Sequence, residues 1–537
     1  MEEVHDFIVI GSGCTGAMAA QTLVEGGANT VMIDVGNSDN HYKNIIPKNN
    51  FQSIRENEEG QHRYFLGDKF ESIDWDKIGT AAQLTPSRQF LIKDIAKFLP
   101  FISTNFSPLE SLAYGGLGSG WGLGCCVYSK PELEKAGLDE KKMEDSYQII
   151  EKRIGISGEK DDVYKYTLNH LENFQKAPEL DTNARQLYEK YLLKKGIINR
   201  KGFFMGRPAL ALLTEDKEER KKTGYYDMDF YSDFGMSAYR PWITIEQLKK
   251  KNNFQYRNNH FVVKVEEKPY GVDIIYYDTE NNLRQTISGK KIILASGTIG
   301  SARILLRSFN SSAQLPFLCN PYTYIPCLQL SMRGKNTEPN RNGFAQLSMF
   351  YDYSNNNLNV SMASIYSYRS LMLFRILKEM PINFSDARIF LQYILSGMVI
   401  CGIHHPEEYS EKNAIDLVKD SNSFTGDKLH FNYSLSEKRK EEINLIEKKF
   451  IWALRKLGCY PLKRINPGMG SSIHYAGTLP FSNEEKPFTL SVEGKLHGTK
   501  NIFVADGSGF KYLPAKGLTF SLMANAHLVA KNVLKNE

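Results

Sequence analysis

Two groups of residues in this sequence have the types and spacing that chemistry requires. The first is the glycine pattern Gly11-Ser12-Gly13-Cys14-Thr15-Gly16, followed by an acid, Asp34, at the end of the next apolar run. In such a pattern the first glycine permits a tight turn, the second lets the backbone approach a pyrophosphate, and the third lets a helix pack closely. A carboxylate placed like Asp34 accepts hydrogen bonds from a ribose diol. We therefore predict dinucleotide binding by Gly11, Ser12, Gly13, Thr15, Gly16 and Asp34, with FAD and nicotinamide cofactors both still possible.

The second group surrounds His474, which lies in the Gly/Ser-rich stretch 470–478. A neutral imidazole can take a proton from a substrate at ordinary pH. A histidine in such a loop can equally be structural, and the residues alone leave both roles open.

Three strand–turn–helix units could position these groups. Apolar residues 7–10 and 30–33 flank a helix-forming stretch that ends at Gly26-Gly27. Similar units occupy 291–308, with Gly297 in the turn, and 501–531, with Asp506 and Gly507 in the turn and Thr519 as a helix N-cap. Continuous apolar strands alternating with helices predict an α/β fold with a parallel, Rossmann-like sheet.

Residues 112–124 form a glycine-rich loop that includes Gly115, Gly116 and Ser119. So many glycines disfavour helix and strand, and they suit a backbone that lies flat against a planar ligand. A flexible linker is the alternative, but Trp121 and the apolar flanks argue against it.

The length of 537 residues suggests two domains, which could be interleaved in sequence.

Basic and acidic residues are mixed along the chain, with a net charge of +6, so no nucleic-acid partner is expected. Seven scattered cysteines, with Cys125 and Cys126 adjacent, fit a reducing compartment. The N-terminus lacks the pattern of a secretion signal, and the apolar run 389–403 is shorter than the roughly 18 residues of a membrane span. We expect a cytoplasmic protein.

Taken in order, four motifs resemble those of the glucose–methanol–choline (GMC) flavoprotein oxidoreductases. They are the glycine motif ending at Asp34, the Gly115-Gly116 loop, the segment 293–306, and the pair formed by 474–478 and 501–508. The resemblance implies an FAD-binding domain made of residues 1–130, 240–310 and 465–537. It also implies a substrate-binding α+β domain, built on an antiparallel sheet, made of 131–239 and 311–464.

The same resemblance implies roles for single residues. His474 would act as the base while FAD oxidises a CH–OH group of a sugar, polyol or other small hydroxylated molecule, with hydride transfer to flavin N5. Asp506 and Gly507 would lie near the ribityl chain and pyrophosphate, the main chain of Val262 near the adenine, and Gly115, Gly116 and Ser119 by the isoalloxazine. The loop around Gly120 and Trp121 has no histidine, which implies non-covalent FAD. The electron acceptor is left open.

One departure from the family pattern concerns the second histidine or asparagine that many members carry after the base. The corresponding stretch, 514–519, offers only Lys516, which could bind the substrate oxygen, stabilise charge on reduced flavin, or extend to solvent. The departure keeps two other functions open: a non-oxidative isomerisation, elimination or cyclisation, and a flavin-binding scaffold without activity.

Several expectations concern the substrate domain. Residues 344–353 and 358–368 predict two paired strands, and 435–457 predicts one amphipathic helix. His404 and His405 have no further ligands at metal-binding spacing and are expected to line the substrate domain, near the pocket. Residues 364–380 mix apolar and basic side chains, and could contact a membrane surface or form a buried helix.

Overall fold

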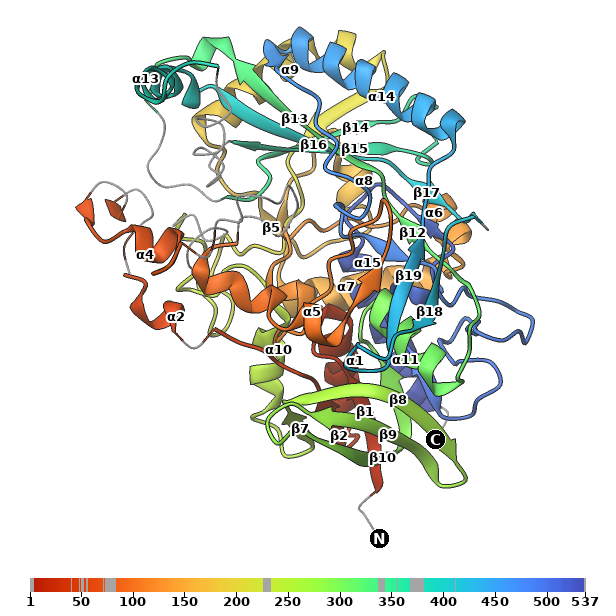
Figure 1. The fold of residues 1–537 in the computed structure, drawn as a ribbon. Coiled ribbons are helices and arrows are strands. Elements are labelled where there is room, and N and C mark those ends of the chain that lie inside the picture. The colour runs from red at the N-terminus through yellow and green to blue at the C-terminus, as the bar shows by residue number, and fades with distance from the viewer. Residues whose placement is uncertain are drawn as a thin grey trace.

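The computed structural model describes residues 4–535 except 40, 48, 50–52, 55, 56, 71, 73–83, 226–232, 337–342, 355, 368–380 and 411. Two large sheets organise the chain, one at the bottom and one at the top of Figure 1. The segment 364–380, for which a membrane contact and a buried helix are both open, lies mostly outside the described residues, which include only its first part, 364–367.

The lower sheet has seven strands in the order β7-β2-β1-β10-β9-β8, with β22 paired to β10. Strands β1, β2, β7 and β22 run parallel to their neighbours, whereas β8 and β9 extend the sheet as an antiparallel pair. The bounds are β1 Val4–Ile10, β2 Thr30–Ile33, β7 Phe254–Arg257, β8 His260–Lys268, β9 Gly271–Asp278, β10 Leu283–Leu294 and β22 Ile502–Val504. All three predicted strand–turn–helix units meet in this sheet, which confirms the Rossmann-like fold.

Helices α1 (Cys14–Glu25), α11 (Thr298–Ser308) and α15 (Thr519–Lys535) follow the three turns of these units. α1 and α15 pack on each other and share one buried apolar cluster with the lower sheet. Each helix begins directly after the carboxyl end of a parallel strand or its loop, so the helix N-termini gather at one edge of the sheet.

The upper sheet is antiparallel, with the order β20-β13-β16-β15-β14-β6. Its strands are β6 Phe203–Gly206, β13 Tyr322–Gln329, β14 Leu347–Tyr351, β15 Ser361–Ser367, β16 Met398–His404 and β20 Cys459–Pro461. β14 and β15 fall inside the two predicted strand ranges and pair as expected. The antiparallel sheet of the second region is thereby confirmed.

Helices α9 (Thr182–Asn199) and α14 (Glu437–Lys456) cover the outer face of the upper sheet. α14 matches the predicted amphipathic helix: Ser436 caps its first turn, and Phe450 and Leu454 are buried against the sheet. Because side chains alternate along a strand, the other face of the same sheet is free to line a cavity.

Helix α7 (Glu140–Ile154) packs against helices α1 and α15 of the lower sheet. Its residues fall in a range expected for the substrate domain, yet Tyr147 lies 2.6 Å from the hydroxyl of Ser521 and stacks on Phe520 of α15. Arg153 also donates to Thr22 of α1 at 3.0 Å. α7 therefore lies against helices α1 and α15, and the expected division of the chain into two domains stays a prediction.

The remaining elements are short or peripheral. The helices are α2 Tyr42–Ile45, α4 His62–Phe65, η1 Pro86–Ile92, α5 Ile95–Phe98, η2 Gly116–Ser119, α6 Lys130–Ala136, α8 Tyr164–Thr167, α10 Pro241–Leu248, η3 Leu330–Met332, α13 Phe384–Leu395 and η4 Gly507–Gly509. The strands are β3 Phe101–Ile102, β4 Ser157–Gly158, β5 Gln175–Lys176, β11 Leu315–Pro316, β12 Leu318–Cys319, β17 Glu407–Glu408, β18 Ala414–Lys419, β19 Asp427–Asn432, β21 Tyr475–Ala476 and β23 Tyr512–Leu513.

The apolar run 389–403 is divided between α13 and β16. Among the described helices, none is both long enough and apolar enough to cross a membrane. All seven cysteines are free and buried.

Candidate active site

A single cavity of about 770 Å³ lies between the two large sheets. Its walls include the glycine motif and Asp34 from the lower sheet and strands β13, β15 and β16 of the upper sheet. Ligand sites of this kind usually enclose about 300–1,000 Å³. The cavity therefore has the size for a cofactor and a small substrate, and it joins the two groups of residues that the sequence singled out.

The glycine motif forms one end of this cavity. Gly11 has φ +103°, and a Cβ there would lie 2.6 Å from the carbonyl oxygen of Ala295. A Cβ at Gly16 would lie 1.9 Å from the carbonyl oxygen of Gly11, so these two glycines are required for packing. Gly13 differs, because a Cβ there would meet no atom within 4 Å and would project into open space. The backbone at Gly13, beside the N-terminus of α1, is thus open to a phosphate.

Ser12 connects the motif to the second glycine-rich loop. Its hydroxyl donates to Asp34 and accepts a hydrogen bond of 2.8 Å from the backbone N–H of Gly115. Burial raises the pKa of Asp34 to about 7, although the hydrogen bond from Ser12 opposes this shift. A ligand diol donating to Asp34 would supply further hydrogen bonds to its charged form.

The other expected cofactor residues divide into two groups. Lining the cavity are Thr15, Gly116, Val262, Gly297, Asp506, Gly507 and Thr519. Gly16, Gly115 and Ser119 are not part of the lining, because Gly16 packs on Gly11, Gly115 turns against Ser119 at φ +87°, and Ser119 donates to the carbonyl of Tyr114 at 2.6 Å. Gly115 and Ser119 support the loop whose residues Gly116, Leu117 and Gly118 form the wall, and their place by the isoalloxazine stays a prediction.

His474 lies in the wall of the cavity. It immediately precedes β21, whose residues Tyr475 and Ala476 pair with Cys319 and Leu318 of β12. Continuing this antiparallel register by one residue places Asn320 opposite His474, and Nδ1 of His474 lies 3.0 Å from Oδ1 of Asn320. Ile473, before the histidine, has φ +58°, a conformation that costs energy for a β-branched residue.

Asn320 determines which imidazole nitrogen of His474 carries the proton. The amide nitrogen of buried Asn320 donates to the carbonyl oxygens of His405, Leu513 and Pro514 at 2.8, 3.2 and 3.2 Å. Those oxygens only accept, so the Asn320 amide has one orientation and its Oδ1 must accept from His474. Nδ1 of His474 therefore carries the hydrogen, and Nε2 keeps its lone pair.

A second histidine, His404, stacks on His474. The two ring centroids are 4.8 Å apart, with an angle of 19° between the planes. Burial lowers the pKa of His474 to about 4. Burial also places the pKa of His404 well below its usual range, and the neighbouring His474 adds to that shift. Both rings are therefore neutral at neutral pH.

His404 and His405 lie next to each other in sequence but on opposite faces of the upper sheet. His404 faces the cavity, together with Tyr322, whose ring centroid is 4.5 Å away. His405 faces α14, where its Nε2 lies 3.5 Å from Glu447, and its Nδ1 lies 3.0 Å from the hydroxyl of Ser361. The expectation that this pair lies near the pocket holds for His404 alone. Among the described residues, no group of His, Cys, Asp and Glu is arranged to hold a metal.

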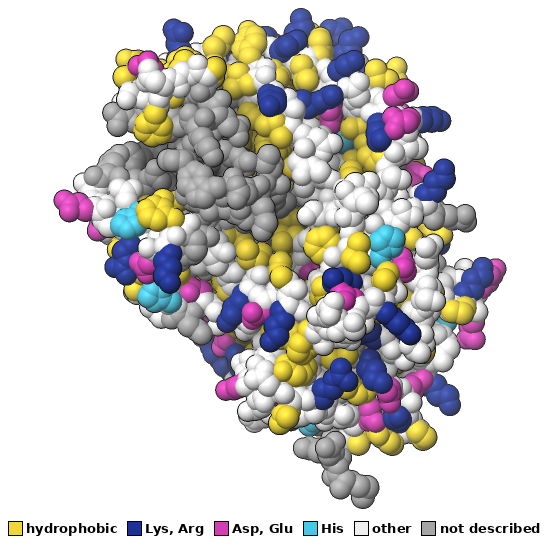
Figure 2. Space-filling view, viewed as in Figure 1, with side chains coloured by type: hydrophobic (Ala, Val, Ile, Leu, Met, Phe, Trp, Pro, Cys, Tyr) yellow, Lys and Arg dark blue, Asp and Glu magenta, His cyan; other side chains and the backbone are white. Residues whose placement is uncertain are grey.

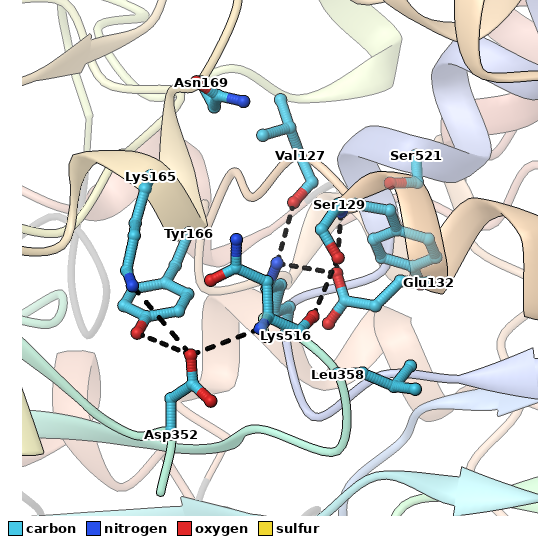
Figure 3. A network of polar contacts seen from close by, with 12 residues as sticks. Val127, Ser129, Glu132, Lys165, Tyr166, Asn169, Asp352, Leu358, Lys516 and Ser521 are labelled. Atoms are coloured by element: carbon cyan, nitrogen blue, oxygen red, sulfur yellow. Dashed lines mark hydrogen bonds and ion pairs between the residues drawn. The ribbon is translucent and has the colours of Figure 1, made fainter. Parts of the chain in front are cut away.

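Lys516 does not reach the cavity. Its ammonium is fully buried, lies 2.6 Å from Glu132 of α6 and donates to the carbonyl of Val127 at 3.2 Å (Figure 3). The neighbours Ala515 and Gly517 line the cavity instead. The expected roles of Lys516 in substrate or flavin binding are corrected accordingly: its charge is used in a buried ion pair.

That ion pair belongs to a larger polar network (Figure 3). Glu132 also accepts from the backbone of Ser129, whose hydroxyl donates to the carbonyl of Asn357 in the β14–β15 loop. In the same loop region Asp352 accepts from Tyr166 at 3.0 Å. The network thus ties the C-terminal segment beside the cofactor groove to the edge of the upper sheet.

No role was predicted for Asn320 from the sequence, and His404 was predicted only to lie near the pocket. Asn320 lies in no recognisable motif, and only the pairing of β12 with β21 brings it to His474. His404 could have been favoured by alternation along an apolar strand, since residues 398, 400, 402 and 404 share one face.

No protein-family model matches the sequence, and no curated protein matches it. Among solved structures, the chain is similar to the crystal structure of pyridoxine 4-oxidase from Mesorbium loti, with a TM-score of 0.58 and 12% sequence identity. The match covers 98% of this chain and 99% of that one. At this identity the similarity establishes the fold, and it confirms at the level of the fold the resemblance to the GMC oxidoreductases.

Proposed function

We propose that this protein is an FAD-dependent oxidoreductase of the GMC type that oxidises a CH–OH group. The observation that carries the proposal is the lone pair on Nε2 of His474, fixed by Asn320 in the wall of a cavity that continues to the glycine motif. A neutral base and a dinucleotide groove in one cavity are the requirements for removing a proton and a hydride from an alcohol.

The residues of the groove fit FAD bound without a covalent link. Open space beside Gly13 and Gly297 admits the cofactor chain, and Asp34 can accept hydrogen bonds from a ribose. Asp506, Gly507 and Thr519 lie along the same wall, and Val262 lies at the edge expected for the adenine. FAD would supply the acceptor for the hydride.

His474 would remove the hydroxyl proton of the substrate through Nε2. As the ring becomes positively charged, its Nδ1–H can keep donating to Asn320, so no change of tautomer is needed. The lowered pKa of His474, about 4, is that of the chain without cofactor or substrate. The negative charge of a developing alkoxide or of reduced flavin beside the ring would favour its protonated form.

We propose that His404 takes the place of the second histidine or asparagine that many family members carry after the base. It comes from the substrate sheet instead of the C-terminal segment, where the side chain of Lys516 turns away. The neutral imidazole of His404 can hold the substrate hydroxyl by a hydrogen bond. Because His404 is uncharged, it does not oppose the protonation of His474.

We also propose an uncharged substrate with a flat or apolar body, in place of the sugar that the resemblance allowed. The upper sheet contributes to the cavity only side chains that are neutral at neutral pH: Tyr322, Tyr324, Ser348, Met362, Ser364, Tyr366, Ile400 and His404. A charged substrate would be desolvated there without an opposite charge. Three tyrosines offer stacking surfaces and hydroxyl hydrogen bonds.

The experiment that tests the proposal is an anaerobic screen of alcohols against the FAD-loaded protein, monitored by loss of flavin absorbance. We expect bleaching by a neutral aromatic or apolar alcohol, and its loss in His474→Asn with FAD still bound. Turnover of a substrate without any electron acceptor would support a non-oxidative reaction instead. Bound FAD that no alcohol reduces would indicate a flavin-binding scaffold.

A further inference from the structure

Two helices of the upper sheet, α13 on the face that carries Met398 and Ile400 and α9 on the opposite face, expose bulky apolar side chains where a surface helix is normally polar. In α13 the inner face is formed by Ala387, Leu391 and Ile394, yet Ile389 and Phe390 on the outside are 50% and 51% exposed. Further exposed apolar side chains on the same helix or just before it are Ile382, Phe384 and Tyr393. The exposed surface of α13 also includes Ser385 and Asp386, so bulky apolar and polar side chains are mixed on it.

Helix α9 shows the same property. Ala184, Leu187, Tyr191 and Ile198 pack inward, whereas Leu192, Leu193 and Ile197 are 50%, 86% and 50% exposed. Leu330 of η3 and Tyr460 and Leu462 of the segment after α14 are also exposed.

These elements form one continuous surface. Lys190 of α9 donates to Ser331 of η3 at 2.9 Å, and the backbone of Gly334 donates to Tyr393 of α13 at 2.9 Å. Lys194 of α9 donates to the carbonyl of Lys456 at the end of α14. We call the exposed side chains of residues 182–201, 330–335, 382–395 and 455–464 the basic–apolar face.

The charge of this face is strongly positive. Its exposed basic residues are Arg185, Lys194, Lys195, Arg200, Lys201, Arg333, Lys335, Arg455, Lys456, Lys463 and Arg464, whereas the exposed acids of the same segments are Glu189 and Asp386. Two of the basic residues form ion pairs with acids outside the face: Lys195 with Asp162 at 2.6 Å and Arg464 with Glu447 at 3.0 Å. Within the part of the chain that the structure describes, Lys201, Lys335 and Lys463 form no ion pair. Figure 2 shows basic and apolar side chains next to each other along the top of the molecule.

We propose that the basic–apolar face docks on an anionic lipid bilayer, with the apolar side chains inserted among the headgroups and the basic side chains on the lipid phosphates. Apolar insertion combined with basic residues at the same depth is the usual design of peripheral membrane surfaces. A protein partner fits less well, because interface cores are depleted of lysine, whereas here Lys194 and Lys195 directly follow Leu192 and Leu193. Long lysine stems can lie along apolar surface while their charges reach the headgroups.

The proposal is tested with the FAD-loaded protein and sedimenting vesicles of phosphatidylcholine, with or without phosphatidylserine. We expect binding to the anionic vesicles only, and weakening of that binding by salt. The double variant Leu192→Ser/Leu193→Ser should bind at least about tenfold more weakly, since two inserted side chains are lost. The matched control is Leu283→Ser, which is 58% exposed on β10 at the other end of the molecule and should bind like the unaltered protein.

Three results would overturn the proposal: no binding to anionic vesicles, equal binding by the double variant, or equal loss in Leu283→Ser. Light scattering on the same samples provides a further test. If the unaltered protein forms a dimer that the double variant dissociates, the face is a contact between two copies and not a membrane surface. Flavin content and melting temperature verify that each variant is folded.

Discussion

The imidazole rings of His404 and His474 lie nearly parallel, 4.8 Å apart, although one ends a strand of the upper sheet and the other precedes β21. Asn320 fixes the second ring, and Tyr322 packs on the first. In the proposed function, the ring of His474 accepts the proton of the alcohol and the ring of His404 orients its oxygen.

Replacing His474 with asparagine should lower the rate of flavin reduction by about a hundred- to ten-thousandfold, because the base is lost. Flavin content should stay the same, since the ring lies outside the glycine motif. Rapid mixing of the loaded enzyme with substrate under anaerobic conditions measures the rate. The exposed His170 provides a control, and its replacement by asparagine should leave the rate unchanged.

Replacing His404 with alanine should lower kcat/KM by about ten- to a hundredfold, the value of a hydrogen bond to the substrate oxygen. His405→Asn is the neighbouring control: it faces Glu447 on the other side of the sheet, so it should lower the melting temperature without a comparable effect on flavin reduction. A larger loss of activity in His405→Asn than in His404→Ala would exclude the positioning role of His404.

The pH dependence of kcat/KM follows from the lowered pKa of His474. Because the neutral ring is the active form, activity should fall only when the pH drops below the ordinary histidine value of about 6.5, towards a pKa of about 4. In Asn320→Asp a carboxylate beside Nδ1 should raise the pKa of His474 and move the acidic limb to higher pH. An acidic limb that stays in place in Asn320→Asp would mean that another group controls it.

Breaking the buried ion pair should affect stability more than chemistry. Lys516→Met leaves Glu132 buried without its partner, and we expect a loss of about 3–5 kcal/mol in the free energy of unfolding. Urea denaturation of the loaded protein measures this loss. The double variant Lys516→Met/Glu132→Leu should recover much of the stability, because neither charge is then left unpaired. Flavin reduction should be similar in every variant that stays folded.

Gly13→Ala should reduce FAD affinity in a protein that still folds, because the added methyl group would enter open cavity and not protein. Gly196→Ala on α9, where a methyl group also meets no atom within 4 Å, is the control and should bind FAD normally. Flavin fluorescence on titration of the FAD-free protein compares the two affinities.

The dinucleotide half of the fold could be predicted from sequence because its signals are local. The turn at Gly11, the helix after it and the strand before Asp34 lie within one short stretch. Each can be predicted from the backbone conformational freedom of glycine or from a run of apolar residues. The paired strands β14 and β15 and helix α14 were predicted by the same kind of periodicity.

The centre of the site depends on contacts between distant segments, and these have no local signal. Asn320 reaches His474 only through the register of a two-residue ladder. Lys516 occupies the expected sequence position, but its side chain turns towards Glu132 on α6, a partner more than 380 positions earlier in the chain. α7 packs on α15 and α1 for a similar reason, because Tyr147 contacts Ser521 of α15 and Arg153 donates to Thr22 of α1.

Strand β16 ends at His404, and His405 directly after it points to the other face of the sheet, so the site is sensitive to the length of the strand. Insertion or deletion of one residue before His404 would exchange the two faces, turning His405 towards the cavity and His404 towards Glu447. The composition of the chain would hardly change. His405 would then supply the ring that stacks on His474, and His404 would face Glu447. Among proteins that share this fold, two whose β16 segments differ by one residue would therefore have different active sites even where their sequences otherwise align.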